Sequence, residues 1–482
     1  MDHRQTKSVP LFSAGWNCWA VPSCGRLAFL IDGKPYFEAL ADALLRAERR
    51  ITILGWDFDS RIALDPECKG AAGQPVGLFL RNLVEERPGL ELRLLIWRNA
   101  LFYGRNDEAI LPVGEVWWRH PRIDLRWDSY HPFGACHHQK IVLIDDKIAF
   151  LGGMDITQRR WDDSDHLPRN PLRRTVSDAI YPPSHDIQVV IDGPAAEAIA
   201  RIAAARWEYM TGAQLASIEP AGDPWPAQVS PELVDHPVAI ARTQPKYRRQ
   251  PAIHEIAALN TDILAAARQS IYLEMQYFAL PEVTDFLADS LTEPEGPEIV
   301  IVANGGPQGI LERYIMAENR DRMFAKLRKA DRFGRLRRFY PIWRGKPDCR
   351  IKIHSKLIVI DDHLLRIGSS NFNSRSLGLD TECDIALQAK DTRARTVIGG
   401  LRNRLLAEHL GTTPELFGER LRSGGSLIAA IEWFNGKSRR MLAAAPSSST
   451  TETSPMPGSA LLDPPRPLSW RYIWNWLAAQ FQ

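Results

Sequence analysis

The sequence is poor in cysteine, in net charge and in long apolar runs, and each shortage excludes a class of protein. Its 482 residues include six cysteines, none in a CxxC pair, so neither a disulfide scaffold nor a zinc ribbon is expected. The 60 basic and 58 acidic residues leave a formal charge of +2, which gives no general affinity for nucleic acid. Nowhere do about eighteen apolar residues run together, and the first residues lack the apolar core of a signal peptide. We therefore expect a cytoplasmic protein with free thiols, soluble or peripheral to a membrane.

The strongest positive signal is an internal repeat. Two segments, 138–145 and 354–361, both follow the pattern HxKxxxxD with an apolar run before the aspartate, and they lie 354 − 138 = 216 residues apart. At the same offset, the glycine turn at 152–155 matches the turn at 368–371. One structural unit is therefore expected to occur twice.

The regions around these segments also match and indicate the fold class. A helical pattern over 36–50 leads into a strand-like run over 51–57, and a second helical pattern over 253–270 leads into a run over 271–277. Strands that alternate with helices predict an α/β layer structure. We expect two pseudo-symmetric α/β/α halves, each a mixed β-sheet flanked by helices, with the active site at their interface.

Composition suggests where the halves begin and end. The N-terminal half is expected over 1–216, a proline-rich connector over 217–250 and the C-terminal half over 251–442. Residues 443–482 begin as a low-complexity tail that is expected to be disordered. The tail ends in an aromatic helical stripe, which either enters a membrane interface or docks back on the protein. The stripe consists of Trp470, Ile473, Trp474, Leu477 and Phe481.

The repeated segment contains the residue types that phosphodiester cleavage needs. Residues two apart in a strand share a face, so His138 projects with Lys140, and His354 projects with Lys356. One imidazole can attack phosphorus and the other can protonate the leaving oxygen. The lysines can offset the phosphoryl charge, so the chemistry needs no metal.

Asp145 and Asp361, the last residues of the two segments, are expected to be structural. Each follows its histidine by seven residues, an odd spacing that places it on the opposite face of a regular strand. Each also opens a polar segment that looks like a hairpin turn to a second strand. We therefore expect these carboxylates to fix the turn or the neighbouring backbone rather than to transfer protons.

The duplicated HxKxxxxD, followed by a Gly-Gly or Gly-Ser turn, resembles the signature of the phospholipase D superfamily, and the likeness extends from Trp16 to about Leu410. The resemblance implies that His138 is the nucleophile and His354 the acid. It also implies a phosphate site made by the lysines and the turn residues. The candidates for that site are Lys140, Lys356, Asn371, Asp155, Gly153 and Ser369. Asp155 stands where the second half has Asn371, and an acid is less apt than an amide beside phosphate.

Each histidine also needs an acidic partner that sets its tautomer. The family pattern suggests a partner from the opposite half, which is Asp186 for His354 and either Glu382 or Asp384 for His138. Aligning the repeats by the Asp-Ile pair at 186–187 and 384–385 favours Asp384, whereas a free choice of strand face permits Glu382. Both stay open.

Within the superfamily, the segments at 152–155, 160–163 and 271–277 look like those of phosphatidylcholine-cleaving phospholipases D. We therefore expect a phospholipase D that acts on phospholipid at a membrane surface, as a peripheral protein without a cofactor. A cardiolipin synthase with the same chemistry and a non-catalytic membrane-binding scaffold are the alternatives. A nuclease is disfavoured by the near-neutral charge.

Two other clusters suggest metal binding but are set aside. His131, Cys136, His137 and His138 are close in the sequence, yet consecutive strand residues point to opposite faces. The aspartates within 162–165 lack the glycine and distal glutamate of a calcium loop, so a solvated loop is expected there. No metal site is therefore predicted.

Overall fold

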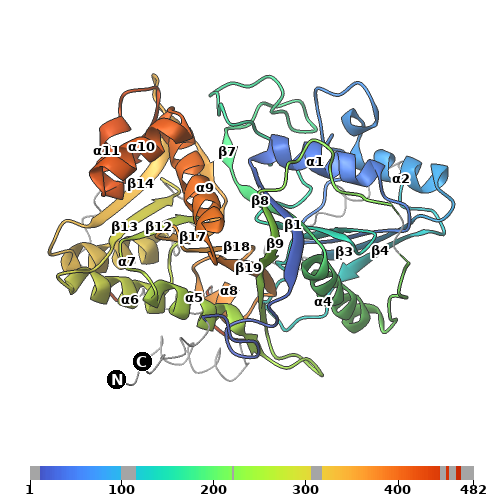
Figure 1. Ribbon diagram of the computed structural model, residues 1–482. Coiled ribbons are helices and arrows are strands. Elements are labelled where there is room, and N and C mark those ends of the chain that lie inside the picture. Colours follow the sequence, from blue (N-terminus) through green and yellow to red (C-terminus); the bar gives the residue numbers. More distant parts are fainter. Residues whose placement is uncertain are drawn as a thin grey trace, which may run out of the picture.

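The computed structural model describes residues 11–98, 116–219, 222–305, 317–445, 452–454 and 463–467. The chain folds into two α/β halves that lie side by side, the first blue to green and the second yellow to red in Figure 1. Each half is built on a large mixed β-sheet with helices on both sides. The expected fold class is therefore confirmed.

The first sheet has eight strands in the order β4-β3-β2-β5-β6-β8-β1-β9. Its strands β2, β3 and β4 run parallel, whereas β5 and β6 form an antiparallel hairpin beside them. The strand bounds in this half are β1 Ser23–Ile31, β2 Arg50–Gly55, β3 Glu91–Trp97, β4 Ile123–Asp128, β5 Ile141–Ile144, β6 Ile148–Gly152, β7 Ser184–His185, β8 Ile187–Asp192 and β9 Leu233–Pro237.

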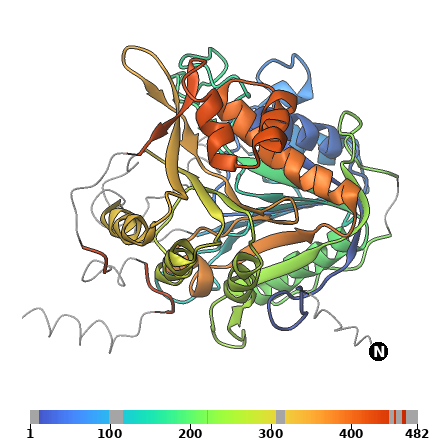
Figure 2. The ribbon, with the colours of Figure 1, turned by 60° about the vertical axis from the view of Figure 1, so that its left-hand side comes forward.

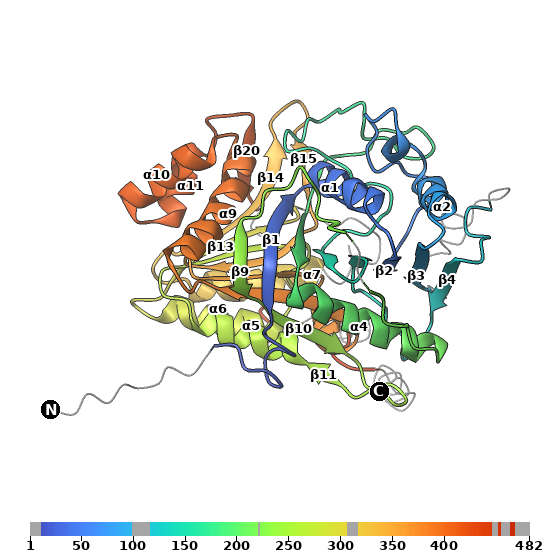
Figure 3. The same ribbon diagram turned by 45° about the vertical axis from the view of Figure 1, so that its right-hand side comes forward.

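Helices cover both faces of the first sheet, as Figure 3 shows. On one side lie α1 Gly33–Leu45, the short 3-10 helix η1 Ala71–Gly73 and α2 Val76–Glu86; on the other lies α4 Pro194–Thr211. One face of α1 is apolar because Tyr36, Leu40 and Leu44 recur at helical spacing, and all three are buried. At the end of α4, Gly212 takes a left-handed conformation with φ 74°, which closes the helix.

The second sheet has ten strands in the order β11-β10-β19-β18-β17-β12-β13-β14-β15, with β20 also paired to β14. Its strand bounds are β10 Ala239–Gln244, β11 Ile253–His254, β12 Ser270–Met275, β13 Glu298–Ala303, β14 Leu336–Trp343, β15 Cys349–Arg350, β17 Lys356–Ile360, β18 Leu364–Gly368, β19 Glu382–Gln388 and β20 Arg440–Ala444. The short strand β16 Lys352–Ile353 pairs with β7 of the first half.

The helices of the second half are α5 Glu255–Ala265, α6 Pro281–Thr292, α7 Ala317–Ala330, α8 Ser374–Gly378, α9 Thr392–Leu410, α10 Pro414–Gly424 and α11 Leu427–Phe434. Figure 2 shows α9, α10 and α11 stacked on one side of the sheet, with α5, α6 and α7 on the other. Both faces of this sheet are therefore covered, as in the first half.

The sheet orders show the repeat directly. The series β4-β3-β2-β5-β6-β8-β1-β9 recurs as β14-β13-β12-β17-β18-β19-β10-β11. The first strands of the two units, β1 and β10, begin 239 − 23 = 216 residues apart. The second unit therefore begins inside the stretch expected to be a connector, where β9 completes the first sheet and β10 opens the second. Proline obscured this in the sequence, since Pro237 lies at the end of an edge strand, where a missing N–H is tolerated.

One hydrophobic core joins the two halves. It contains Leu143 and Ile187 from the first sheet, Leu357 and Ile367 from the second, and Ile199 from α4. A second core belongs to the first half, and a third lies around the second sheet and also includes Cys18 of the N-terminal segment. The shared core places the β5–β6 hairpin close to its counterpart, β17–β18.

The C-terminal region is described only in part. Within the described ranges, none of the helices combines the length and the apolar character that crossing a membrane requires. The segment at 463–467 returns to α8, where Asp463 accepts hydrogen bonds from the backbone N–H groups of Ser374 at 2.9 Å and Arg375 at 2.8 Å. The aromatic stripe from Trp470 to Phe481 lies outside the described residues.

Candidate active site

Each repeated segment delivers its histidine and lysine to the start of a buried hairpin. His138 and Lys140 come immediately before β5, while His354 precedes β17 and Lys356 is its first residue. The hairpins are rigid because every residue of β5, β6, β17 and β18 is buried. The two functional pairs are therefore fixed to the sheets rather than to mobile loops.

The backbone of each histidine is held by the opposite half. The N–H of His138 donates to the carbonyl of Thr381 at 3.0 Å, and the N–H of His354 donates to the carbonyl of His185 at 2.8 Å. Thr381 and His185 immediately precede the two acids expected to act on the histidines. The two halves thus exchange the same hydrogen bond about a pseudo-twofold axis.

The side chain of each histidine is held in the same crossed manner. Nδ1 of His138 lies 2.9 Å from Oε2 of Glu382, and Nδ1 of His354 lies 2.6 Å from Oδ2 of Asp186. A carboxylate fixes the proton on Nδ1 and leaves Nε2 as the nitrogen available for reaction. The imidazole of His138 keeps 17% of its surface exposed and that of His354 keeps 7%, so both remain accessible.

Asp384 does not contact His138, and the alternative that the repeat alignment favoured is therefore wrong. Its carboxylate is fully buried and pairs with the guanidinium of Arg366, whose Nε lies 2.6 Å from Oδ2. Sheet register explains the error. Gly152 pairs with Gln188 and Gly368 pairs with Asp384. The true offset at this strand is therefore 384 − 188 = 196, which makes Glu382 the counterpart of Asp186.

The two lysines have different partners. Nζ of Lys140 lies 3.2 Å from Oδ2 of Asp155, and Nζ of Lys356 donates to Oε1 of Gln276 at 2.9 Å. Both ammonium groups also donate to the carbonyl of the histidine two residues before them. Lys140 is therefore paired with a carboxylate, whereas Lys356 donates to the amide oxygen of Gln276.

Asp155 and Asn371 differ in the same way. Oδ1 of Asp155 accepts a hydrogen bond from the backbone N–H of Trp56 at 2.8 Å, while its other oxygen faces Lys140. Oδ1 of Asn371 is buried and has no hydrogen-bond partner within the described part of the chain. Asp155 thus ties Lys140 to the end of β2, and phosphate contact by either residue stays a prediction.

Burial and the lysines keep the two imidazoles neutral. Burial lowers the pKa of His138 well below its usual value, and the charges of Lys140 and Lys356 lower it further. For His354, burial again has the largest effect on the pKa, followed by Lys356 and Arg160. Since Lys140 and Lys356 act on both rings, the two histidines share one electrostatic environment.

Asp145 and Asp361 lie at the far ends of the strands and hold backbone. Asp145 accepts from the N–H groups of Glu48, Arg49 and Arg50 at 2.9, 2.7 and 2.8 Å. Asp361 accepts in the same way from three consecutive N–H groups, at 268–270. These contacts fit the structural role that their odd spacing from the histidines suggested.

The turn residues contact the carboxylates that hold the histidines. Oγ of Ser369 donates to Oε2 of Glu382 at 2.5 Å. A side chain at Gly153 would collide with the carboxylate of Asp186, so only glycine allows this approach. These two residues therefore position the acids, and direct phosphate contact by them stays a prediction.

Two further residues at the site lie within segments 271–277 and 160–163, whose sequence pattern does not single out either residue. Gln276 binds Lys356, and Arg160 lowers the pKa of His354 while its Nε has no hydrogen-bond partner among the described residues. Their positions depend on the register of β12 and on the course of the loop after β6. Neither is visible from spacing alone.

The cluster around residue 131 does not converge on a metal site. Nε2 of His131 accepts from the indole of Trp97 at 2.9 Å, whereas Nδ1 of His137 contacts Oγ1 of Thr381 at 2.9 Å. Burial lowers the pKa of His137 to about 3, so it is a neutral interior residue. Across the described ranges, the groups of side chains close enough to bind a metal lie elsewhere, around His185.

Comparison with known proteins agrees with this geometry. A family model described as "Cardiolipin synthase, PLD-like domain" matches residues 261–397, which include the second repeated segment. A protein named phospholipase D1 from Saccharomyces cerevisiae is 25% identical over 80% of this chain, and phospholipase D1 from Schizosaccharomyces pombe is 21% identical over 84%. The chain belongs to the phospholipase D superfamily.

The match covers most of this chain but only a minor part of each yeast relative. The chain spans 29% of the Saccharomyces cerevisiae protein and 37% of the Schizosaccharomyces pombe protein. A solved structure, the phosphatidylserine synthase of Haemophilus influenzae Rd KW20, superposes with a TM-score of 0.56 at 14% identity. That match covers 85% of this chain and 96% of the synthase, so the two proteins share the same fold over most of their length.

Proposed function

We propose that this chain is a phospholipase D, which transfers a phosphatidyl group from a glycerophospholipid to His138 and then to water or another alcohol. The products are phosphatidic acid or a new phosphatidyl-alcohol, together with the original head-group alcohol. The proposal is supported most by one observation. Two imidazoles, each held at Nδ1 by a carboxylate from the opposite half, share the field of two buried lysines.

The first step uses the free nitrogens of the two rings. Nε2 of His138 attacks phosphorus and forms a P–N bond, while the P–O bond to the head group breaks. The leaving oxygen takes a proton from Nε2 of His354. Because that ring rests neutral, we infer that the negative charge of the bound phosphodiester raises the pKa of His354 and loads it with the proton.

The second step reverses the roles. The neutral His354 removes a proton from water or from an alcohol, whose oxygen attacks phosphorus and breaks the P–N bond. Lys140, Lys356 and Arg160 offset the charge on the phosphoryl oxygens in both steps. No net electron transfer occurs, and His138 and His354 return to their starting protonation states.

A cardiolipin synthase is the second candidate, because the matching family model carries that description over 261–397. The chemistry would be the same, with phosphatidylglycerol as both donor and acceptor. Product analysis separates the two. We expect vesicles of labelled phosphatidylcholine to yield phosphatidic acid, and vesicles of labelled phosphatidylglycerol to yield no cardiolipin; the reverse pattern would support the synthase.

The covalent intermediate is tested by adding a primary alcohol. With phosphatidylcholine vesicles and 1-butanol, we expect phosphatidylbutanol to form at the expense of phosphatidic acid. His138→Ala and His354→Ala should each lower turnover by about 10²- to 10⁴-fold while the circular dichroism spectrum is unchanged. His363→Ala, in the partly buried turn between β17 and β18, is the control and should keep full turnover. Product without phosphatidylbutanol would indicate direct attack by water, and no product from any phospholipid would favour the scaffold.

A further inference from the structure

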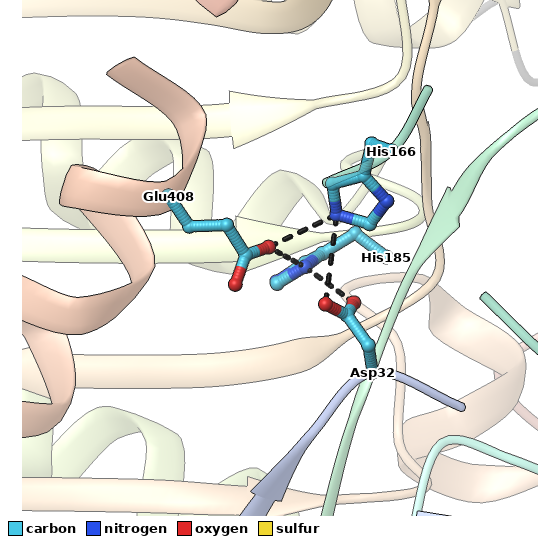
Figure 4. Close-up of side chains that lie close together, drawn as sticks. All are labelled: Asp32, His166, His185 and Glu408. Atoms are coloured by element: carbon cyan, nitrogen blue, oxygen red, sulfur yellow. Dashed lines mark hydrogen bonds and ion pairs between the residues drawn. The ribbon is translucent and has the colours of Figure 1, made fainter. Parts of the chain in front are cut away.

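A second group of titratable side chains lies beside the active site, and the proposed reaction does not use it. Asp32 follows β1, His166 belongs to the loop after β6, His185 ends β7, and Glu408 belongs to α9 of the second half. Figure 4 shows the four side chains converging on one point. All four are buried or nearly so, and one nitrogen or oxygen of each lies within 4.8 Å of those of the others.

The distances between these atoms suit a four-coordinate ion. Nδ1 of His185 lies 2.9 Å from an oxygen of Asp32 and 2.9 Å from an oxygen of Glu408. Nε2 of His166 lies 3.0 Å from the same Glu408 oxygen and 3.6 Å from Asp32. Ligands that each lie 2.0–2.2 Å from a tetrahedral zinc ion are separated by about 3.3–3.6 Å. A shift of a few tenths of an ångström would admit the ion.

Several of these atoms lack the hydrogen bonds that buried polar groups normally make. Neither oxygen of Asp32, nor Nδ1 of His185, has a hydrogen-bond partner within the described residues. Two carboxylates flank Nδ1 at equal distance, yet neither meets the geometry of a hydrogen bond. Orphaned atoms of this kind call for a ligand.

The second nitrogen of each imidazole is already bound to a carboxylate. Nδ1 of His166 contacts Oδ2 of Asp162 at 2.8 Å, and Nε2 of His185 contacts Oε2 of Glu274 at 3.1 Å. Histidines that bind metals typically donate their other N–H to a carboxylate, which orients the ring and fixes the tautomer. Both rings therefore have the outer contact that a metal ligand needs, with the inner nitrogen turned toward the same point.

The buried charge also requires compensation. Four carboxylates belong to the cluster: Asp32, Asp162, Glu274 and Glu408. The guanidinium of Arg173 offsets one of them, because it pairs with Asp162 at 2.8 Å. A divalent ion bound between the two imidazoles in their neutral form would offset two of the three remaining negative charges. Two imidazoles and two carboxylates are a donor set that suits zinc and neighbouring transition metals rather than calcium.

We propose that Asp32, His166, His185 and Glu408 form a structural site for a divalent transition metal ion of the zinc type. No local sequence pattern predicts this site, since its ligands come from four separate segments that only the fold brings together. Asp162, expected in a solvated loop, is fully buried and serves as the outer partner of His166.

The ion would tie the two halves together next to His354. The carbonyl of His185 accepts the hydrogen bond from the N–H of His354, and the N–H of Asp32 donates to the carbonyl of Asp186 at 2.8 Å. Glu408 is the ligand from the second half. If the proposed function holds, the metal therefore fixes the strand that presents Asp186 to His354, without contacting substrate.

Metal counting on the full chain tests the site independently of turnover. After dialysis with Zn²⁺ and removal of the excess, we expect one zinc per chain by plasma mass spectrometry, and a lower unfolding temperature after chelation. Asp32→Asn keeps the shape and the backbone of the ligand, and it should weaken zinc binding by at least about tenfold. Glu408→Gln, on α9, should do the same. Asp178→Asn, an exposed carboxylate on the same loop as His166, is the matched control and should keep the metal.

Spectroscopy of the unmodified protein protects the test against variants that fail to fold. Co²⁺ in a tetrahedral site of nitrogen and oxygen ligands absorbs in the visible region, so uptake should give this band, and Zn²⁺ should displace it. A chain that retains no zinc and shows no such band overturns the proposal. So does zinc retained equally by both ligand variants, because the ion would then lie elsewhere. Either result leaves the proposed lipid chemistry standing.

Discussion

Lys356 is a fully buried lysine, and its environment determines its charge. Burial lowers its pKa to about 7, although the carboxylate of Asp186 acts in the opposite direction. The groups that face its ammonium are His354, Gln276, Asp186, Lys140, Arg160 and Glu382. An oxyanion in the site would add negative charge beside it and favour the protonated form.

This predicts proton uptake when an oxyanion binds. The pKa of Lys356 in the folded protein is about 7, below the usual 10.5, so above pH 7 much of the amine is neutral. A dianion raises that pKa and draws in a proton, so its affinity falls as pH rises through about 7 to 8. Calorimetry of tungstate binding at pH 8, in two buffers of different ionisation enthalpy, should show net uptake of protons.

Lys356→Met provides the control for this prediction. The substitution keeps an apolar stem of similar length in a buried position, so the fold should keep or gain stability. Proton uptake should fall to the share taken up by His354, and tungstate should bind more weakly. Lys326→Met, at an exposed ion pair with Asp285, should change neither quantity. Equal proton uptake in Lys356→Met would assign the titration to another group.

The acids Glu382 and Asp384 lie two residues apart on one strand and are expected to fail in different ways. Glu382→Gln removes the carboxylate from Nδ1 of His138 and should lower kcat by about 10²- to 10⁴-fold with little change in stability. Asp384→Asn weakens the buried pair with Arg366 and should lower the free energy of unfolding by about 3 kcal/mol, with kcat changed less than tenfold. Kinetics and urea unfolding of both variants measure the contrast.

The opposite pattern would reassign the partner of His138. If Asp384→Asn lost turnover while its urea midpoint stayed unchanged, the contact seen here between His138 and Glu382 would not be the functional one. Asp186→Asn supplies an internal comparison, since it should resemble Glu382→Gln at the other histidine.

At the scale of elements, the β5–β6 hairpin is fixed to the start of β2 and to the turn before it through one carboxylate. Asp145 accepts three backbone N–H groups and has a positive φ of 53°, a conformation that asparagine also tolerates. In Asp145→Asn, an amide N–H group replaces one accepting oxygen. We expect a loss of about 1.5–3 kcal/mol in the free energy of unfolding, measured by urea titration, with unchanged kcat in the folded protein.

Asp146→Asn is the matched control for the hairpin. The neighbouring residue has nearly the same φ, 52°, but its carboxylate is partly exposed and makes a single contact, at 3.3 Å, with Arg50. It should cost less than about 1 kcal/mol. A fall in kcat without a loss of stability in Asp145→Asn would indicate that Asp145 takes part in catalysis instead.

The elements also show how far the sequence could predict the structure. The repeated segments predict both hairpins, because a period of two and an apolar run are local signals. The strand pairing that brings Glu382 to His138 depends on a register between β18 and β19 that local pattern does not contain. Proline density around 217–250 hid β9 and β10, whose stability comes from pairing with β1 and β19 rather than from propensity. The cluster around His185 could not be predicted from local pattern, because its four side chains come from separate segments.

At the scale of the whole molecule, the halves are joined through contacts that each half needs for its own site. Each histidine takes a backbone and a side-chain partner from the other half, and the largest core contains residues of both sheets. The two units are similar in sequence pattern and strand order, yet the histidine of each takes its acidic partner from the other. We therefore expect the halves to fold together instead of behaving as two domains on a connector.

A pair of core substitutions, one in each half, tests whether the two halves fold together. Leu80 of α2 is fully buried in the core of the first half, and Leu287 of α6 is fully buried in the core around the second sheet. Each leucine-to-alanine change should cost about 2–5 kcal/mol and lower one common unfolding temperature, by calorimetry and by tryptophan fluorescence alike. In the double variant the two losses should add, because the sites are distant. Independent halves would instead show two transitions, with each substitution moving only its own; in that case the crossed contacts at the histidines would be too weak to join the folding of the two units.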